Sequence, residues 1–129
     1  MDAPEVLRTS ARYPLPDSDP DLADLRSWAS TLLADLSEDV LLDVQLVCTE
    51  LASNAYEHAA APRVVRMSRT NEVIRVEVED GTPAELPQLG ESRIADSRGR
   101  GLVLVAHLSR CWGTREAADG KTVWAEISV

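Results

Sequence analysis

The sequence predicts an α+β protein, a two-layer sandwich in which helices pack on one face of a mixed, mainly antiparallel β-sheet. Two stretches before residue 60 carry apolar side chains at three- and four-residue spacing, which is typical of amphipathic helices. Two later pairs of segments alternate apolar and polar residues around short turns, which is typical of β-hairpins. At 129 residues the chain is expected to form a single domain, residues 1–129, with its own hydrophobic core.

The N-terminal part predicts an edge strand followed by a helix. Residues 6–13 alternate weakly and two prolines follow at once, which allows an edge strand but disfavours a central one. Asp19 can cap a helix whose first turn holds Pro20, and apolar residues at helical spacing then continue to about Leu36.

A second helix is expected from the capping residue Ser37 to about Ala59, because Pro62 prevents its continuation. Glu38 and Asp39 stand in its first turn, where the helix dipole favours negative charge. One stripe along this helix is apolar and is predicted to face the core: Val40, Val44, Val47, Leu51 and Ala55.

The same helix carries a polar column made of Glu50, Asn54 and His58. Steps of four residues advance about 40° beyond one helical turn, so these side chains lie along one flank. A carboxylate, an amide oxygen and an imidazole together suit a hard divalent cation such as Mg²⁺ with its waters, with the carboxylate available to accept a proton. A solvated helix face would have the same pattern, so the column alone leaves both interpretations open.

Residues 63–69 and 72–79 are predicted to form a β-hairpin with Thr70-Asn71 as its turn. Asp80 then falls on the same side as the apolar residues of the second strand, which places a carboxylate at the inner edge of the core. A strand-end aspartate followed by Gly81 is also a common turn former, so Asp80 has two interpretations at this point.

Residues 81–98 have no sustained period and are predicted to form one long loop, and loops of that length are usually lids or disordered segments. The loop leads into Gly99-Arg100-Gly101, and a short apolar helix is expected to begin at Leu102. Glycines at a helix start let a ligand approach the backbone, and the free amides with the helix dipole favour an anion. A lone Gly-Arg-Gly is more often a simple loop than a phosphate site.

Residues 112–115 and 121–129 are predicted to close the sheet as a second hairpin around residues 118–120. Alternate residues of its last strand are expected on the inner face of the sheet: Val123, Ala125, Ile127 and Val129. Cys48 and Cys111 are expected to be small core residues and not a disulfide, because no export signal is visible.

The chain is acidic, with 13 Lys and Arg against 22 Asp and Glu and a formal net charge of −9. This charge opposes direct binding to nucleic acid or to an anionic membrane, so an acidic ligand must be held by local groups. The N-terminal residues have neither a basic start nor an apolar block, which predicts a cytoplasmic protein.

Four motifs follow one another in a fixed order: Glu50-x-x-x-Asn54-x-x-x-His58 on a helix, Asp80-Gly81 after a strand, Gly99-Arg100-Gly101-Leu102 opening a helix, and Thr122 near the last strand. This order resembles the Bergerat ATP-binding fold shared by gyrase, the ninety-kilodalton heat-shock chaperone and sensor histidine kinases. The similarity spans nearly the whole chain and is greatest to the anti-sigma-factor serine/threonine kinases.

The resemblance implies a binding site for ATP and Mg²⁺. In it, Asn54 coordinates the metal, Glu50 is the catalytic general base, and Asp80 accepts a hydrogen bond from the adenine amino group. A carboxylate cannot donate a hydrogen bond, so a buried Asp80 would also select adenine over guanine on chemical grounds. The other cofactor-binding positions implied are His58, Gly81, Gly99, Arg100, Gly101, Leu102 and Thr122.

The sequence departs from the family pattern in two places. The family's Asp-x-Gly-x-Gly is here Asp80-Gly81-Thr82-Pro83-Ala84, which lacks the glycines at the third and fifth positions and makes the start of the lid stiffer. Thr122 has the opposite strand parity from Val123, so contact with adenine requires a bulge or an outward-facing pocket.

The leading hypothesis is an ATP-dependent regulator that sequesters a sigma factor and phosphorylates a serine of an antagonist protein. The alternative is a non-catalytic, nucleotide-gated protein-binding module. A histidine-kinase catalytic fragment ranks third, because the sequence has no helical hairpin with a phospho-acceptor histidine ahead of this fold. Neither the identity of the partners nor the formation of a homodimer follows from the sequence.

Overall fold

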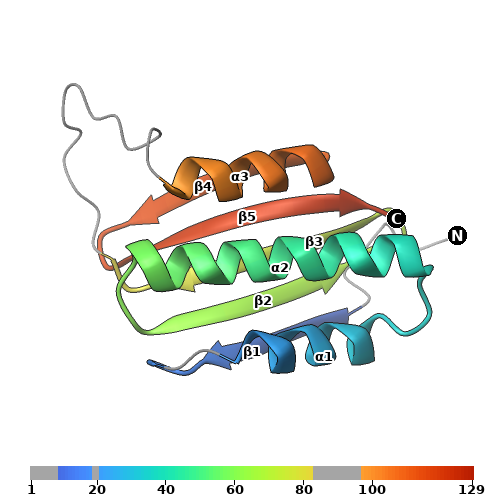
Figure 1. The fold of residues 1–129 in the computed structure, drawn as a ribbon, viewed down its shortest axis with the longest axis horizontal. Helices are drawn as coiled ribbons and strands as arrows, with labels where there is room; N and C mark the ends of the chain where they lie inside the picture. Colours follow the sequence, from blue (N-terminus) through green and yellow to red (C-terminus); the bar gives the residue numbers. More distant parts are fainter. Residues whose placement is uncertain (1–8, 19–20, 83–96) are drawn as a thin grey trace, which may run out of the picture.

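The computed structural model describes residues 9–18, 21–82 and 97–129 of the chain. Within them, three helices form one layer against a five-stranded sheet, which confirms the predicted class (Figure 1). The elements in chain order are β1 (Thr9–Leu15), α1 (Leu22–Leu32), α2 (Glu38–His58), β2 (Arg63–Arg69), β3 (Val73–Asp80), α3 (Ser97–Leu108), β4 (Cys111–Ala117) and β5 (Gly120–Ser128).

The strands lie in the order β1-β2-β3-β5-β4, and each neighbouring pair is antiparallel. The prediction allowed a mixed sheet, and the described strands contain no parallel pair. The register places Val65 beside Val78 and Val78 beside Val123, so one row of valines crosses the three central strands on the face that the helices cover.

The core lies between this face and the helices. On α2, four of the five residues predicted for the core stripe are buried, namely Val44, Val47, Leu51 and Ala55. Val40 is partly buried and packs at the margin of the core. The helix therefore uses the apolar face that its periodicity indicates.

The first helix is shorter than predicted. It begins at Leu22, and Asp21 is its cap, with Asp21 Oδ1 accepting a hydrogen bond from the Asp24 amide at 3.0 Å. The predicted cap Asp19 and Pro20 lie outside the described residues. The helix ends at Leu32, before the predicted Leu36, because a tight turn leads into the cap of the next helix.

The second helix agrees closely with the prediction. Ser37 caps it, with the side chain accepting a hydrogen bond from the Val40 amide at 3.2 Å, and the helix continues to His58 with Ala59 as its C-terminal cap. The hairpin that follows turns at Thr70, whose hydroxyl accepts hydrogen bonds from the Glu72 and Val73 amides.

The remaining differences between the prediction and the structure lie in the edge strands and at the end of β5. β1 is an edge strand as predicted, but it continues through Pro14, which pairs with Val64; residues 6–8 lie outside the description. Val129 follows the end of β5 and is 44% exposed, so its predicted place on the inner face is wrong. Both cysteines are free; Cys48 is buried as predicted, whereas Cys111 is exposed because β4 is the other edge strand.

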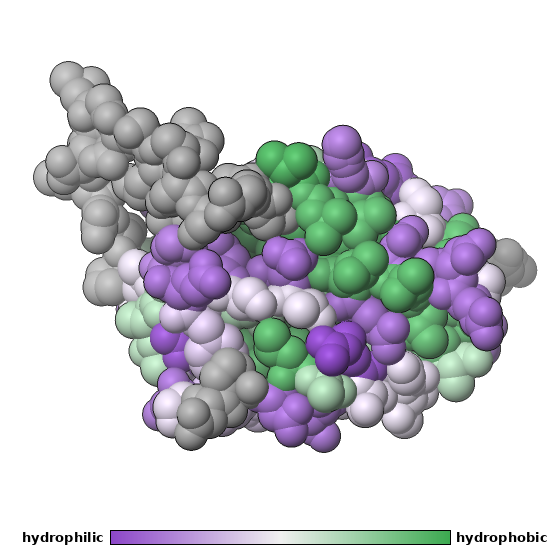
Figure 2. Space-filling model, in the orientation of Figure 1, coloured by the Kyte–Doolittle hydropathy of each residue, from purple (hydrophilic) through white to green (hydrophobic). Residues whose placement is uncertain are grey.

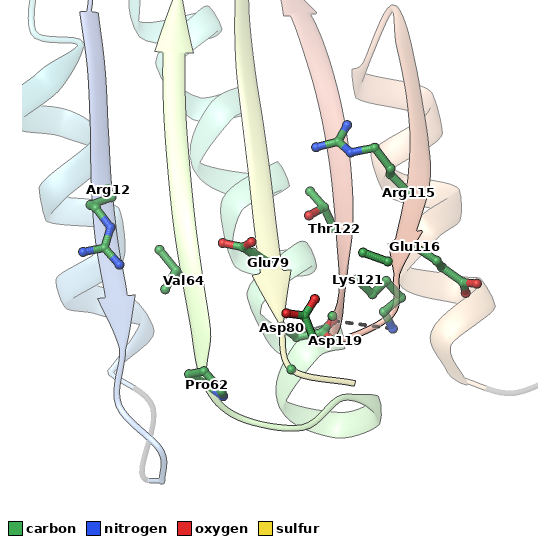
Figure 3. Close-up of a pocket in the computed structure, with 13 residues that line it drawn as sticks. Arg12, Pro62, Val64, Glu79, Asp80, Arg115, Glu116, Asp119, Lys121 and Thr122 are labelled. Atoms are coloured by element: carbon green, nitrogen blue, oxygen red, sulfur yellow. Dashed lines mark ion pairs between the residues drawn. The ribbon is translucent and has the colours of Figure 1, made fainter. Parts of the chain in front are cut away.

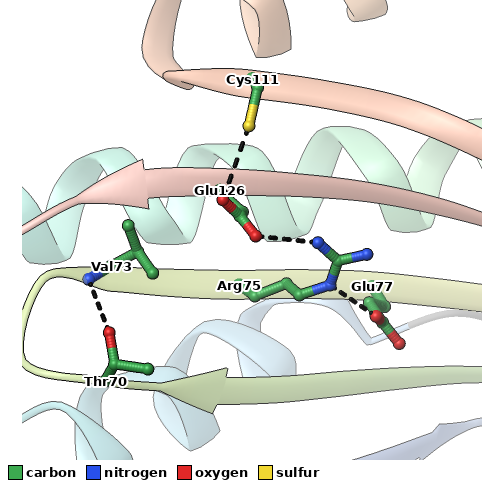
Figure 4. A network of polar contacts seen from close by, with 6 residues as sticks. All are labelled: Thr70, Val73, Arg75, Glu77, Cys111 and Glu126. Carbon is green, nitrogen blue, oxygen red and sulfur yellow. Dashed lines mark hydrogen bonds and ion pairs between the residues drawn. The ribbon is translucent and has the colours of Figure 1, made fainter. Parts of the chain in front are cut away.

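The face of the sheet away from the described helices is polar and internally paired (Figure 4). Arg75 donates to Glu77 Oε2 at 2.7 Å and to Glu126 Oε2 at 2.9 Å, and its guanidinium lies 4.3 Å from the centre of the Trp124 ring. Cys111 donates to the other oxygen of Glu126 at 3.5 Å. These contacts join β3, β5 and β4 across the outer face.

None of the helices in the described ranges combines the length and the apolar composition that crossing a bilayer requires.

Candidate functional site

Three of the predicted motifs meet at one end of the molecule. The C-terminus of α2, the end of β3 and the start of α3 lie at the same end in Figure 1. Two hydrogen bonds tie the first two together: the Gly81 amide donates to Ala60 O at 2.8 Å, and the Ala60 amide donates to Thr82 Oγ1 at 2.9 Å. The strand end that carries Asp80 is thereby held against the chain that leaves α2.

Arg63 fixes the end of α2. Its Nε donates to Ala55 O at 3.0 Å and its Nη2 donates to Ala59 O at 2.7 Å, so two carbonyls of the last helical turn gain partners. The guanidinium also lies 4.7 Å from the centre of the Tyr56 ring. The positive charge of Arg63 is favourable here, because the C-terminus of a helix is the negative end of its dipole.

The polar column of α2 lies on the flank that faces away from α1. Gln45 marks the α1 flank, because its Nε2 donates to Ser30 Oγ at 2.8 Å and to Arg26 O at 3.1 Å. Asn54 comes nine residues later, which is two and a half helical turns and therefore the opposite side. Figure 1 shows α3 on that side of α2, so Glu50, Asn54 and His58 face the flank where α3 packs.

Two atoms of this column are buried without a hydrogen-bond partner. Within the described part of the chain, Asn54 Oδ1 and His58 Nε2 belong to a set of five such side-chain atoms. His58 Nε2 lies 3.5 Å from Glu57 Oε1, which is an ion pair only when the imidazole is protonated. Buried polar groups in proteins are nearly always paired, so two orphans on one predicted column indicate a place for a ligand.

Asp80 is buried, as its strand parity predicts. Its Oδ1 accepts a hydrogen bond from the Thr82 amide at 2.8 Å, so the turn-forming role is present as well. Its Oδ2 lies 3.6 Å from Lys121 Nζ. The carboxylate is therefore held by a backbone donor on one side and faces a cation on the other.

Gly81 has a packing reason to be glycine. A Cβ atom there would lie 2.5 Å from Ala61 O and 3.0 Å from the Pro62 ring. The chain after α2 could not approach β3 so closely with any side chain at this position.

Thr122 does not share a face with Asp80. It pairs with Glu79, and its side chain lies on the outer face, where it helps line a pocket of about 570 Å³ (Figure 3). Asp80 and Gly81 border the same pocket, whereas Glu50, Asn54 and His58 do not. The outward-facing pocket that Thr122 requires thus exists, but it opens on the other side of the sheet from the α2 column.

The residue beside Asp80 on the inner face is Lys121, its cross-strand partner on β5. The sequence reasoning missed this residue. The signal was present, because Lys121 lies two positions before Val123 and so has the same parity as the buried residues of the last strand.

The third helix begins earlier than predicted. It starts at Ser97, so the predicted loop to Arg98 extends two residues into the helix and the predicted start at Leu102 is five residues too late. Gly99 stands in the first turn and Gly101 in the second. Glycine lowers helix stability by about 1 kcal/mol relative to alanine, and the packing of α3 on α2, which includes the fully buried Val105, outweighs that cost.

Gly99 and Arg100 therefore belong to the N-terminal end of α3, which is the positive end of the helix dipole. Leu102 is partly buried and packs against the core. The predicted lid spans residues 81–98, and its part from 83 to 96 lies outside the described part of the chain. Its role stays a prediction.

A family model described as a histidine kinase-like ATPase domain matches residues 15–127. The match covers all three described helices, including the two orphaned atoms on α2, and the strands β2, β3, β4 and nearly all of β5. It leaves out β1 except for Leu15, and it extends over far more than half of the chain. The chain therefore belongs to this family. A comparison with curated proteins found no match.

Proposed function

We propose that this member of the histidine kinase-like ATPase family binds ATP with Mg²⁺ where α2, β3 and α3 meet. The observation that carries the proposal is the pair of buried atoms without partners, Asn54 Oδ1 and His58 Nε2. An unsatisfied buried polar group costs about 1–3 kcal/mol, and a ligand that bonds to it removes that cost.

The residues present fit a nucleotide and its metal. The described residues contain no group of three His, Cys, Asp or Glu side chains that could hold a metal by themselves. Asn54 supplies one hard oxygen, and Mg²⁺ in proteins commonly takes one or two protein ligands with phosphate oxygens and waters. Bound Mg²⁺ would neutralise charge on the phosphates. His58 adds a second polar contact one turn further along α2.

The start of α3 suits the phosphates. Its first turn contains no acidic residue, and its free amides and dipole favour an anion in a protein whose net charge is −9. Asp80 suits the base, because a buried carboxylate accepts a hydrogen bond from an exocyclic amine.

Within this framework, the specific activity that we propose is that of an anti-sigma-factor serine/threonine kinase: sequestration of a sigma factor and phosphorylation of a serine on an antagonist protein. Glu50 lies one turn before Asn54 and is partly buried. It is the proposed general base, which accepts the proton of the serine hydroxyl as that oxygen attacks the terminal phosphorus and ADP leaves.

The proposed surface for a protein partner is the exposed face of α2 and α3. Leu42 and Leu46 on α2 and Val103 on α3 are the large apolar residues that remain exposed there, and Figure 2 shows hydrophobic side chains gathered on this side. Leu42 and Leu46 precede Glu50 at the same four-residue step, so the apolar surface leads along α2 into the polar column. An exposed apolar patch of this kind suits a protein partner.

The alternative function is a nucleotide-gated binding module that has lost phosphoryl transfer. One sequence feature favours it: Asp80-Gly81-Thr82-Pro83-Ala84 lacks both glycines of the family's Asp-x-Gly-x-Gly. The same site would then bind nucleotide, and nucleotide would control capture of the partner.

Glu50→Gln tests the kinase against this alternative. The substitution keeps the size of the side chain and removes its basicity, so ATP binding should persist while phosphate transfer falls by about 10² to 10⁴, as is usual for loss of a general base. The measurement is transfer of labelled phosphate to serine on candidate antagonist proteins, with ATP affinity measured by calorimetry in parallel.

Glu38→Gln is the matched control, because Glu38 is an exposed carboxylate at the opposite end of the same helix. It should leave transfer unchanged. Absence of transfer by the wild type, with ATP binding and partner capture intact, would establish the binding module instead. Transfer that survives in the Glu50 variant would remove Glu50 from the mechanism.

A further inference from the structure

The carboxylate of Asp80 does not stand alone at the base end of the proposed site. Asp80 and Lys121 are directly opposite each other in the antiparallel register of β3 and β5, so both side chains leave the sheet on the same face. Their charged atoms, Asp80 Oδ2 and Lys121 Nζ, are 3.6 Å apart (Figure 3). The two side chains form one unit with an acceptor beside a donor.

Both partners are withdrawn from solvent. The side chain of Asp80 is 1% exposed and that of Lys121 is 13% exposed. A buried lysine is costly to keep without strong partners. The separation of 3.6 Å is longer than a direct N–H···O hydrogen bond, so the ammonium does not use its donors fully on Asp80.

Among the described residues, Asp80 is the polar partner of the Lys121 ammonium, and an ammonium has three N–H donors. Gly120 precedes it at a point of close approach, because a Cβ atom there would lie 2.6 Å from Asp80 O. The backbone of β5 thus fixes where Lys121 starts. The pair lies on the inner face of the sheet, at the margin of the pocket that opens on the outer face.

We propose that Lys121 is a specificity-determining residue that donates a hydrogen bond to the purine ring nitrogen next to the exocyclic amine, while Asp80 accepts from that amine. This inference rests on the proposed nucleotide site and deepens it. The amine of adenine is flanked by two ring acceptors, N1 on one edge of the base and N7 on the other, so an acceptor–donor pair matches either edge. Asp80 alone would read only the amine.

The test compares ADP with two analogues in which one ring nitrogen is replaced by CH, 1-deaza-ADP and 7-deaza-ADP, by titration calorimetry. The wild type should bind one of the two about 10-fold more weakly than ADP, since a hydrogen bond to a charged donor is lost. Lys121→Met keeps the length of the side chain and should bind ADP about 10-fold more weakly without distinguishing that analogue. Lys121→Arg retains a donor and should restore the discrimination.

Arg115→Met is the control for charge alone, because Arg115 is an exposed cation on the outer face that also borders the pocket. This variant should leave unchanged the ratio between the affinity for ADP and the affinity for the weaker deaza analogue. The inference is overturned if the wild type binds both analogues as tightly as ADP, if the ratio persists in Lys121→Met, or if that variant binds ADP more tightly, which would make Lys121 a competitor of the base.

The first of these outcomes needs only the wild-type protein, so it decides the matter even if Lys121→Met fails to fold. The proposed function and this inference fail in different ways. No binding of ADP to the wild type overturns both, whereas ADP binding without discrimination between the analogues overturns the role of Lys121 alone.

Discussion

The polar side chains on the two flanks of α2 differ in their hydrogen bonding. On the flank toward α1, Gln45 donates to two acceptors of the neighbouring helix, at 2.8 and 3.1 Å. On the flank toward α3, Asn54 is a chemically similar amide, but its Oδ1 is buried without a partner. The same helix therefore carries one amide that stabilises the fold and one that the fold leaves unused.

The difference separates structural from functional polarity. A satisfied amide adds about 1 kcal/mol to stability, whereas an unsatisfied buried one lowers it. Natural proteins retain such a cost mainly at sites where a ligand supplies the missing bond. The comparison predicts that substitutions on the two flanks separate binding from stability.

The largest effect is expected at Asp80. Asp80→Asn keeps the shape of the side chain but loses its charge and places a donor near the base amine, so ATP affinity should fall by about 100-fold. Thr82 can still donate to the remaining oxygen, so the turn should persist. Calorimetry measures the affinity, and a thermal melt of the same sample checks the fold. Unchanged affinity would leave Asp80 with its turn role alone.

A smaller effect is expected at Asn54. Asn54→Ala removes the proposed oxygen ligand, so the part of ATP affinity that depends on Mg²⁺ should weaken by about 10-fold. Without nucleotide the variant should be at least as stable as the wild type, because an unpaired buried acceptor is gone. Titrations with and without Mg²⁺ test the first expectation. Equal Mg²⁺ dependence in both proteins would exclude the metal role.

The smallest effect on binding is expected at Gln45. Gln45→Ala deletes two hydrogen bonds to α1 and should lower the free energy of unfolding by about 1 kcal/mol, or the melting temperature by about 4 °C. ATP affinity should change less than about 2-fold, since the flank faces away from the site. A loss of ATP affinity as large as that of Asn54→Ala would show that both flanks of α2 contribute to binding.

Much of the fold could be predicted because its signals are local. The apolar stripe and the Ser37 cap of α2 fix that helix, and alternation around Thr70 fixes the first hairpin. Boundaries were less predictable, because several acidic residues near residue 20 can each serve as a cap. The start of α3 depends on tertiary packing of Val105, which overrides the local preference of two glycines.

The site was predictable only in part, for a geometric reason. Spacing along one helix indicates that Glu50, Asn54 and His58 share a flank, and strand parity indicates that Asp80 points inward. The neighbour of Asp80 depends on which strand pairs with β3 and in which register, and sequence spacing alone does not contain that information. The outward direction of Thr122 followed from its strand parity, whereas the position of Lys121 opposite Asp80 became evident only from the assembled sheet.

The central claim is that the nucleotide binds on the α3 flank of α2 and against Asp80. Measuring amide hydrogen exchange with and without Mg²⁺-ADP locates the binding site directly. The account predicts slower exchange in residues 50–60, 80–82 and 97–101 when Mg²⁺-ADP is present, with little change in α1. Exchange that slows only in β4 and β1, on either side of the outer-face pocket, or in no part of the chain, would contradict it.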